Sequence, residues 1–295
     1  MNVSRQAPKL AIGTAQFGLS YGISNTDGQT PPTEARAILD LAKQAGIHEI
    51  DTAIAYGDSE RVLGELGVTG WQVITKLPRL PDSCDSILEW VQAQIDGSRQ
   101  RLRLDRIAGL LLHSPTQLLG PSGQELYRAL LSLKTAGLVE KIGISIYGPD
   151  ELDALPGHMK LDIVQAPANV LDTRMRQSGW VARLKEAGCE FHARSVFLQG
   201  LLLMRQADRP DRFQRWQPLW QTWDTWLATH GLSALQACIR YAVQASEADR
   251  IVVGIANAKQ LSEILEAMNG PAVELPAALH TDDLALLNPA SWGSR

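Results

Sequence analysis

Polar and ionisable side chains end five successive short apolar segments of this chain. A carboxylate, a phenol, an amine and an imidazole that meet in one place could move a proton and stabilise negative charge on an oxygen atom. Each such side chain alone would ordinarily be solvated at the end of a strand. Their recurrence at five strand ends favours one functional site over five separate surface features. The residues are Asp51, Tyr56, Lys76, His113, Ser145 and Gln165.

The elements that must position these residues are predicted by an alternation of short apolar runs with longer stretches of helical spacing. Repeated eight times, this order predicts parallel strands joined by helices. Eight such units can close into a (β/α)8 barrel, a TIM barrel, whose active residues lie at the C-terminal strand ends. A doubly wound open sheet is the alternative. The expected strands are 9–13, 47–52, 72–76, 106–113, 139–145, 161–165, 190–195 and 250–254.

The expected helices begin and end at recognisable signals. The first follows two prolines, with Thr33 as its N-cap and Gly46 as its C-terminal cap. Residues 206–229 are expected to be an irregular insertion, and residues 269–295 are expected to be a short tail. We therefore expect a single domain over residues 1–295, with a core of about 9–268. The other helices are expected at 59–66, 83–104, 122–136, 179–187, 232–244 and 258–268.

Composition narrows the class of protein. Of the 295 residues, 45% are hydrophobic and 20% charged, which is typical of a soluble globular chain. The net charge of −4 argues against a nucleic-acid-binding domain. The three cysteines have no zinc-binding spacing, and neither a secretory signal nor a membrane span is expected. We therefore expect a cytoplasmic protein without a metal, acting on a small molecule.

Four stretches of the sequence together resemble the aldo-keto reductase family. They are GTAQFG at 13–18, DTAIAYGDSE at 51–60, Lys76, and LLH at 111–113, and the resemblance runs from about Leu10 to Met268. It implies a single-domain barrel that reduces an aldehyde or ketone with NADPH, through a tetrad of Asp51, Tyr56, Lys76 and His113. A cofactor-binding regulatory subunit on the same fold, with little turnover, is one alternative. An unrelated barrel such as a metal-dependent hydrolase is another.

The chemistry explains why the tetrad needs these residue types. Hydride transfer to a carbonyl carbon builds negative charge on the oxygen, which must be held and protonated. A phenol has a pKa near 10, so a cation beside it is needed to make it an effective acid near neutral pH. The resemblance implies that Tyr56 is the general acid and Lys76 the cation. It also implies that Asp51 holds Lys76 and that His113 orients the carbonyl.

The cofactor is not expected in a Rossmann domain, because no GxGxxG follows the first strand. The resemblance implies that Ser145 and Gln165 hold the nicotinamide carboxamide and that Arg194, in place of an aromatic residue, stacks on the ring. Ala256 and Ile264 depart from the family pattern, which leaves NADH open beside NADPH. The remaining implied contacts, to the pyrophosphate and adenosine parts, are Ser195, Val196, Phe197, Leu198, Gly200, Arg205, Gly254, Gln260 and Glu263.

Other features concern the substrate and the packing. Tyr21 and Asn169 are expected to line the substrate pocket, because each lies in a loop that follows a strand. Tryptophans at 216, 220, 223 and 226 have helical spacing, which indicates a packing face or, alternatively, a lid or a partner surface.

Overall fold

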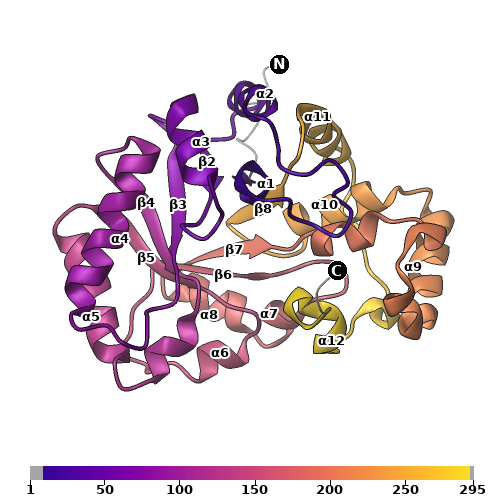
Figure 1. The fold of residues 1–295 in the computed structure, drawn as a ribbon. Coiled ribbons are helices and arrows are strands. Elements are labelled where there is room, and N and C mark those ends of the chain that lie inside the picture. Colours follow the sequence, from indigo (N-terminus) through magenta and orange to yellow (C-terminus); the bar gives the residue numbers. More distant parts are fainter. Residues whose placement is uncertain (1–8, 293–295) are drawn as a thin grey trace, which may run out of the picture.

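The structure is a computed structural model and describes residues 9–292. Its eight parallel strands, β1 to β8, close into a barrel in sequence order (Figure 1). Closure is made by β1 and β8, where Gly13 lies opposite Gly254, so the fold is the predicted barrel and not an open doubly wound sheet. The strands are β1 (Leu10–Gly13), β2 (Glu49–Asp51), β3 (Gln72–Leu77), β4 (Ile107–Leu112), β5 (Val139–Ser145), β6 (Ile163–Pro167), β7 (Glu190–Arg194) and β8 (Arg250–Gly254).

Helices surround the barrel because the outward-facing side chains of its strands are largely apolar and must be covered. The apolar faces of the helices cover them, so the strands are largely buried on both faces. All residues of β4 are buried, for example, and the sequence there shows no alternation. The helices are α1 (Ala15–Gly18), α2 (Pro32–Gln44), α3 (Ser59–Leu66), α4 (Ile87–Leu102), α5 (Gly123–Thr135), α6 (Asp150–Asp153), α7 (Arg174–Gln177), α8 (Trp180–Glu186), α9 (Gln217–His230), α10 (Ala234–Gln244), α11 (Ala258–Ala267) and α12 (Leu284–Leu287).

Two details of the expected helices are wrong. Helix α2 begins at Pro32 with Pro31 as its N-cap, and Thr33 lies within the first turn. Proline is well suited to a first turn because its missing N–H would have no partner there. Helix α4 begins at Ile87, where the Ser86 hydroxyl accepts a hydrogen bond from the Glu89 N–H, and not at residue 83. Proline geometry therefore favours the start of α2, and a side-chain cap favours the start of α4.

The segment 206–229 is more regular than expected, because it contains most of the 14-residue helix α9. Trp220, Trp223 and Trp226 on this helix are buried, at 1%, 0% and 8% exposure. Trp223 and Trp226 stack with ring centroids 5.7 Å apart. The structure thus confirms the packing interpretation for these three tryptophans, whereas Trp216 is only half-buried and donates to Asp283 at 2.8 Å.

Within residues 9–292, no helix combines the length and the apolar character that crossing a bilayer requires. The same residues contain no group of three or more His, Cys, Asp or Glu side chains that could hold a metal ion.

Candidate active site

A buried ion pair lies at the C-terminal rim of the barrel. Asp51 ends β2 and lies opposite Ile74 of β3, so Lys76, two residues further along, projects to the same face. The Lys76 Nζ is 2.5 Å from Asp51 Oδ1 and also donates a hydrogen bond to the Thr52 carbonyl at 2.9 Å. Lys76 is 1% exposed and Asp51 is 4% exposed. The carboxylate therefore holds the amine in a buried position at the rim.

Two more strand ends extend this pair across the barrel. The second oxygen of Asp51, Oδ2, accepts a hydrogen bond from Gln165 Nε2 at 2.7 Å. Gln165 Oε1 in turn accepts one from the Ser145 hydroxyl at 3.2 Å, because the two residues lie opposite each other on β5 and β6. Four predicted residues from four strands thus form one continuous chain of polar contacts.

The Tyr56 phenol ring and the His113 imidazole meet at the edge of this chain. The Lys76 Nζ lies 5.1 Å from the centroid of the Tyr56 ring. The His113 ring meets the Tyr56 ring edge to face, with centroids 5.9 Å apart and an angle of 81°. A phenol, an ammonium and an imidazole therefore converge from the ends of β2, β3 and β4, as the strand-end pattern predicts.

The loop that carries Tyr56 is anchored by the two residues that open α3. The Ser59 hydroxyl, fully buried, donates to the Thr14 carbonyl at 2.9 Å. Glu60 accepts a hydrogen bond from the Thr75 hydroxyl at 2.6 Å and pairs with Arg101 at 2.7 Å. These contacts tie the loop to β1, β3 and α4, so the phenol is held by a rigid support.

The His113 side chain is kept neutral by its surroundings. Burial, together with the positive charges of Lys76 and Arg194, lowers the pKa of His113 to about 4, although Asp51 acts in the opposite direction. At neutral pH its imidazole carries one N–H donor and one acceptor nitrogen. It can therefore donate a hydrogen bond to an oxygen without adding a proton of its own to the site.

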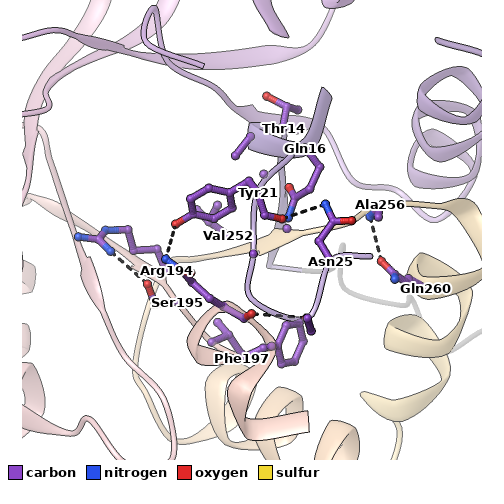
Figure 2. Close-up of a pocket in the computed structure, with 18 of the residues that line it drawn as sticks. Thr14, Gln16, Tyr21, Asn25, Arg194, Ser195, Phe197, Val252, Ala256 and Gln260 are labelled. Atoms are coloured by element: carbon purple, nitrogen blue, oxygen red, sulfur yellow. Dashed lines mark hydrogen bonds between the residues drawn. The ribbon is translucent and has the colours of Figure 1, made fainter. Parts of the chain in front are cut away.

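A cavity of about 540 Å³ is lined by Asp51, Tyr56 and His113 and also by the first turns of α11. Figure 2 shows its lining around Tyr21, Arg194 and Gln260. Most of the residues that sequence reasoning assigned to catalysis, cofactor or substrate line it. They are Tyr21, Asp51, Tyr56, His113, Ser145, Gln165, Arg194, Ser195, Val196, Phe197, Gly200, Gly254, Gln260 and Glu263.

Four assigned residues do not line the cavity. Lys76 lies behind Asp51, with which it pairs. Leu198 belongs to the loop that follows β7, and its side chain is buried in the core. Arg205 is exposed and pairs with Asp208 at 2.6 Å. The buried Asn169 donates to the Ser195 carbonyl, and its side-chain oxygen accepts two backbone N–H groups. Asn169 therefore braces the loop after β7 from behind.

The loop between β1 and α2 crosses the cavity, which the sequence did not indicate (Figure 2). The Tyr21 hydroxyl accepts a hydrogen bond from Gln199 Nε2 at 3.2 Å, and the Ser24 hydroxyl donates to the Gln199 carbonyl at 3.5 Å. Gln16, which also lines the cavity, has a buried Oε1 without a partner among residues 9–292. Applying the strand-end argument to β1 would have identified Gln16.

The loop after β7 has an unusual backbone conformation. Ser195, Leu198 and Gln199 have positive φ angles of 57°, 47° and 54°, which are uncommon for residues with a Cβ atom. Gly200 follows at 92°, and a Cβ there would lie 1.9 Å from the Ser24 hydroxyl oxygen. The Leu198 and Gly200 N–H groups donate to the Ser195 and Phe197 carbonyls, so these two N–H groups hold the turn itself. The turn forms part of the cavity wall.

The far end of the cavity is formed by the start of α11. The Asn257 side chain caps this helix by accepting from the Gln260 N–H at 2.9 Å, and Gln260 Oε1 accepts from the Ala256 N–H at 2.9 Å. A Glu34 oxygen accepts from the Ala258 N–H at 2.6 Å, so a carboxylate already complements the helix dipole. The Gln260 side chain consequently shapes the backbone turn at which the cavity ends.

The rim of this barrel joins a buried carboxylate–ammonium pair to a phenol and an imidazole, and a cavity large enough for a nucleotide lies beside them. This arrangement is typical of NAD(P)H-dependent oxidoreductases. Comparison with known proteins agrees. The profile of the "Aldo/keto reductase family" matches residues 9–275, and the chain belongs to this family. It is an oxidoreductase that acts on the carbonyl group of small molecules, as the sequence predicted.

Individual relatives are similar along half or nearly all of the chain. A D-threo-aldose 1-dehydrogenase of Pseudomonas is 29% identical, over 94% of this chain and 95% of the relative. A 6-dehydroglucose reductase of Novosphingobium aromaticivorans is 32% identical over about half of each chain, 50% and 51%. The holo form of an aldo-keto reductase from Bacillus halodurans superposes with a TM-score of 0.70 at 20% identity, covering 90% of this chain and 88% of the other. That structure supports the fold alone.

Proposed function

We propose that this oxidoreductase reduces an aldehyde or ketone to an alcohol with NADPH and that Tyr56 is the general acid. One observation carries the proposal: the Tyr56 ring lies 5.1 Å from a buried ammonium and 5.9 Å from the imidazole of His113. The reaction needs a proton donor, a charge that stabilises the donor after it has lost its proton, and a group that orients the carbonyl. The three side chains have these three properties.

Each residue has a distinct role in the reduction of the carbonyl group. When bound, the reduced nicotinamide supplies the hydride that goes to the carbonyl carbon. His113, neutral at physiological pH, donates a hydrogen bond to the oxygen and Tyr56 transfers its proton to it. Lys76 stabilises the phenolate that remains, and Asp51 keeps the amine in place and charged. The proton is then restored to Tyr56 from solvent.

Cofactor binding is proposed along the cavity wall. Ser145 and Gln165 would hold the carboxamide, the loop after β7 the pyrophosphate, and Gly254, Gln260 and Glu263 the adenosine part. One N–H of the Gln165 side chain already donates to Asp51. The nicotinamide carboxamide would therefore bind to the other N–H and to the oxygen of Gln165, and to the Ser145 hydroxyl. Arg205 would contribute only after releasing Asp208.

One observation favours NADH over NADPH. Asp27 and Glu263 line the cavity, Glu263 in α11, and Glu34 lies at the start of that helix. Lys259 is 3.8 Å from Glu263. A carboxylate suits the ribose hydroxyls of NADH, whereas the phosphate of NADPH needs a cation. NADPH stays our first proposal from the sequence, and NADH is the second candidate.

Titration of tryptophan fluorescence with NADPH and with NADH, followed by a panel of carbonyl substrates, tests these proposals. The enzyme should bind at least one dinucleotide and oxidise it in the presence of an aldehyde. Tyr56→Phe should bind it equally well and reduce the aldehyde far more slowly. Binding without turnover on any carbonyl compound would favour the regulatory subunit, and no dinucleotide binding would overturn the assignment.

A further inference from the structure

The charges that line the catalytic end of the cavity are unbalanced. Lys76 is neutralised by Asp51 and does not line the cavity, and His113 is neutral at physiological pH. Among residues 9–292, Arg194 is the one lysine or arginine that lines it. The acids that line it besides Asp51 are Asp27, in the loop between β1 and α2, and Glu263, in α11. A fixed positive charge thus faces the space in which a carbonyl substrate must lie.

Arg194 is held in position by groups that leave its charge uncompensated. Its guanidinium carbon lies 4.7 Å from the centroid of the Tyr147 ring, so one face of the group is stacked. Nη2 donates to the Ile146 carbonyl at 2.9 Å and Nη1 to the Ser195 hydroxyl at 3.1 Å. All of these partners are formally neutral, and the buried Nε has no partner within the described part of the chain.

The charge of Arg194 reaches the residues beside the reacting oxygen. It contributes, after burial and Lys76, to the low pKa of His113. It also acts on Tyr21, although burial of that phenol, the largest effect, keeps the pKa of Tyr21 above its ordinary value. Because the Tyr21 oxygen accepts a hydrogen bond from Gln199, its own hydrogen is available for another acceptor.

We propose that Arg194, assisted by the Tyr21 hydroxyl, binds a carboxylate carried by the substrate, so that the preferred substrates are acidic aldehydes or ketones. This inference rests on the proposed carbonyl reduction and names the substrate class for that site. A guanidinium suits a carboxylate because its planar N–H groups match both oxygens. Arg194 is then a specificity-determining residue, and the reaction itself is unchanged.

The test compares 4-carboxybenzaldehyde with its neutral isostere 4-formylbenzamide. With either NADPH or NADH, whichever binds, wild type should show a kcat/KM about 10- to 100-fold higher for the acid, as expected for hydrogen bonds to a charged group. Added salt should reduce this preference. In Arg194→Gln the ratio of the two kcat/KM values should fall to about one, whereas Arg194→Lys should retain part of the preference.

Arg183→Gln is the matched control. Arg183 also stacks on an aromatic ring, 3.9 Å from the Trp180 centroid, and donates to a backbone carbonyl, but it lies outside the cavity. This variant should keep the wild-type ratio. Equal kcat/KM for acid and amide in wild type would overturn the inference and leave the proposed function intact. An equal loss on both compounds in Arg194→Gln, with weaker dinucleotide binding, would instead make Arg194 a cofactor contact. Failure to reduce either compound, when another carbonyl compound of the panel is reduced, would overturn this inference and leave the proposed function intact.

Discussion

Replacing Lys76 by methionine would leave the Asp51 carboxylate buried without its cation. Removing one partner of a buried pair costs about 3–5 kcal/mol of stability, so the single variant confounds folding with chemistry. The double variant Lys76→Met with Asp51→Asn removes both charges together. The asparagine oxygen can still accept the hydrogen bond that Gln165 donates at 2.7 Å, and the main loss is the bond to the Thr52 carbonyl. We expect the double variant to be the more stable of the two.

The effect on the reaction scales with the distance between the ammonium and the phenol, and Lys76 Nζ lies 5.1 Å from the centroid of the Tyr56 ring. With the phenolate charge taken at roughly this separation, about 5 Å, two unit charges attract by about 0.8 kcal/mol in water and about 3 kcal/mol at an effective dielectric constant of 20. If the Tyr56 phenolate forms fully in the transition state, loss of Lys76 should slow hydride transfer by about 4- to 200-fold. The buried position of Lys76 favours the upper part of this range.

Single-turnover oxidation of the bound dinucleotide, followed by stopped-flow fluorescence, measures this step without product release. Urea unfolding of wild type, Lys76→Met and the double variant measures stability in parallel. A double variant that folds, binds the dinucleotide and transfers hydride at the wild-type rate would refute the role of the ammonium. If the rate of hydride transfer falls only in the less stable Lys76→Met variant and returns to the wild-type value in the double variant, the ion pair has a structural role only.

Three further predictions concern single residues. Tyr56→Phe should lower kcat by about 100-fold or more, as expected for a lost general acid, with an unchanged dinucleotide Kd by fluorescence titration. Gln260→Ala removes the acceptor of the Ala256 N–H and should raise the dinucleotide Kd more than it lowers the rate at saturation; an unchanged Kd would remove Gln260 from the site. The pKa of His113 is lowered to about 4, so between pH 6.5 and 4 the unfolded chain binds more protons and stability falls as pH falls. From pH 7 to 5, wild type should lose about 2 kcal/mol more than His113→Asn in urea unfolding, and equal losses would contradict the neutral imidazole.

The convergence of the site was predictable because parallel strands bring their C-terminal ends to one rim. Asp51, Lys76 and His113 were identified on that ground, and the structure brings them together. The hydrogen bond from Gln165 to Asp51 was not predictable, since it joins residues 114 positions apart and depends on barrel closure. Asn169 also follows a strand, but its side chain caps its own loop.

Loops and helix starts were predicted less well, for a different reason. Their conformation depends on single capping bonds and on contacts with distant loops, neither of which leaves a periodic signal. Pro31 and Ser86 set the starts of α2 and α4 through local geometry. The crossing of the cavity by residues 19–28 depends on Gln199, far away in sequence.

That crossing has a kinetic consequence. Residues 19–28 contact the loop after β7 through hydrogen bonds of 3.2 and 3.5 Å that Gln199 makes with Tyr21 and Ser24. A nucleotide that lies beneath these residues can leave only when these hydrogen bonds break, and hydrogen bonds of this length are weak. The rate at which residues 19–28 move away from the loop after β7, and not the rate of hydride transfer, would then limit turnover.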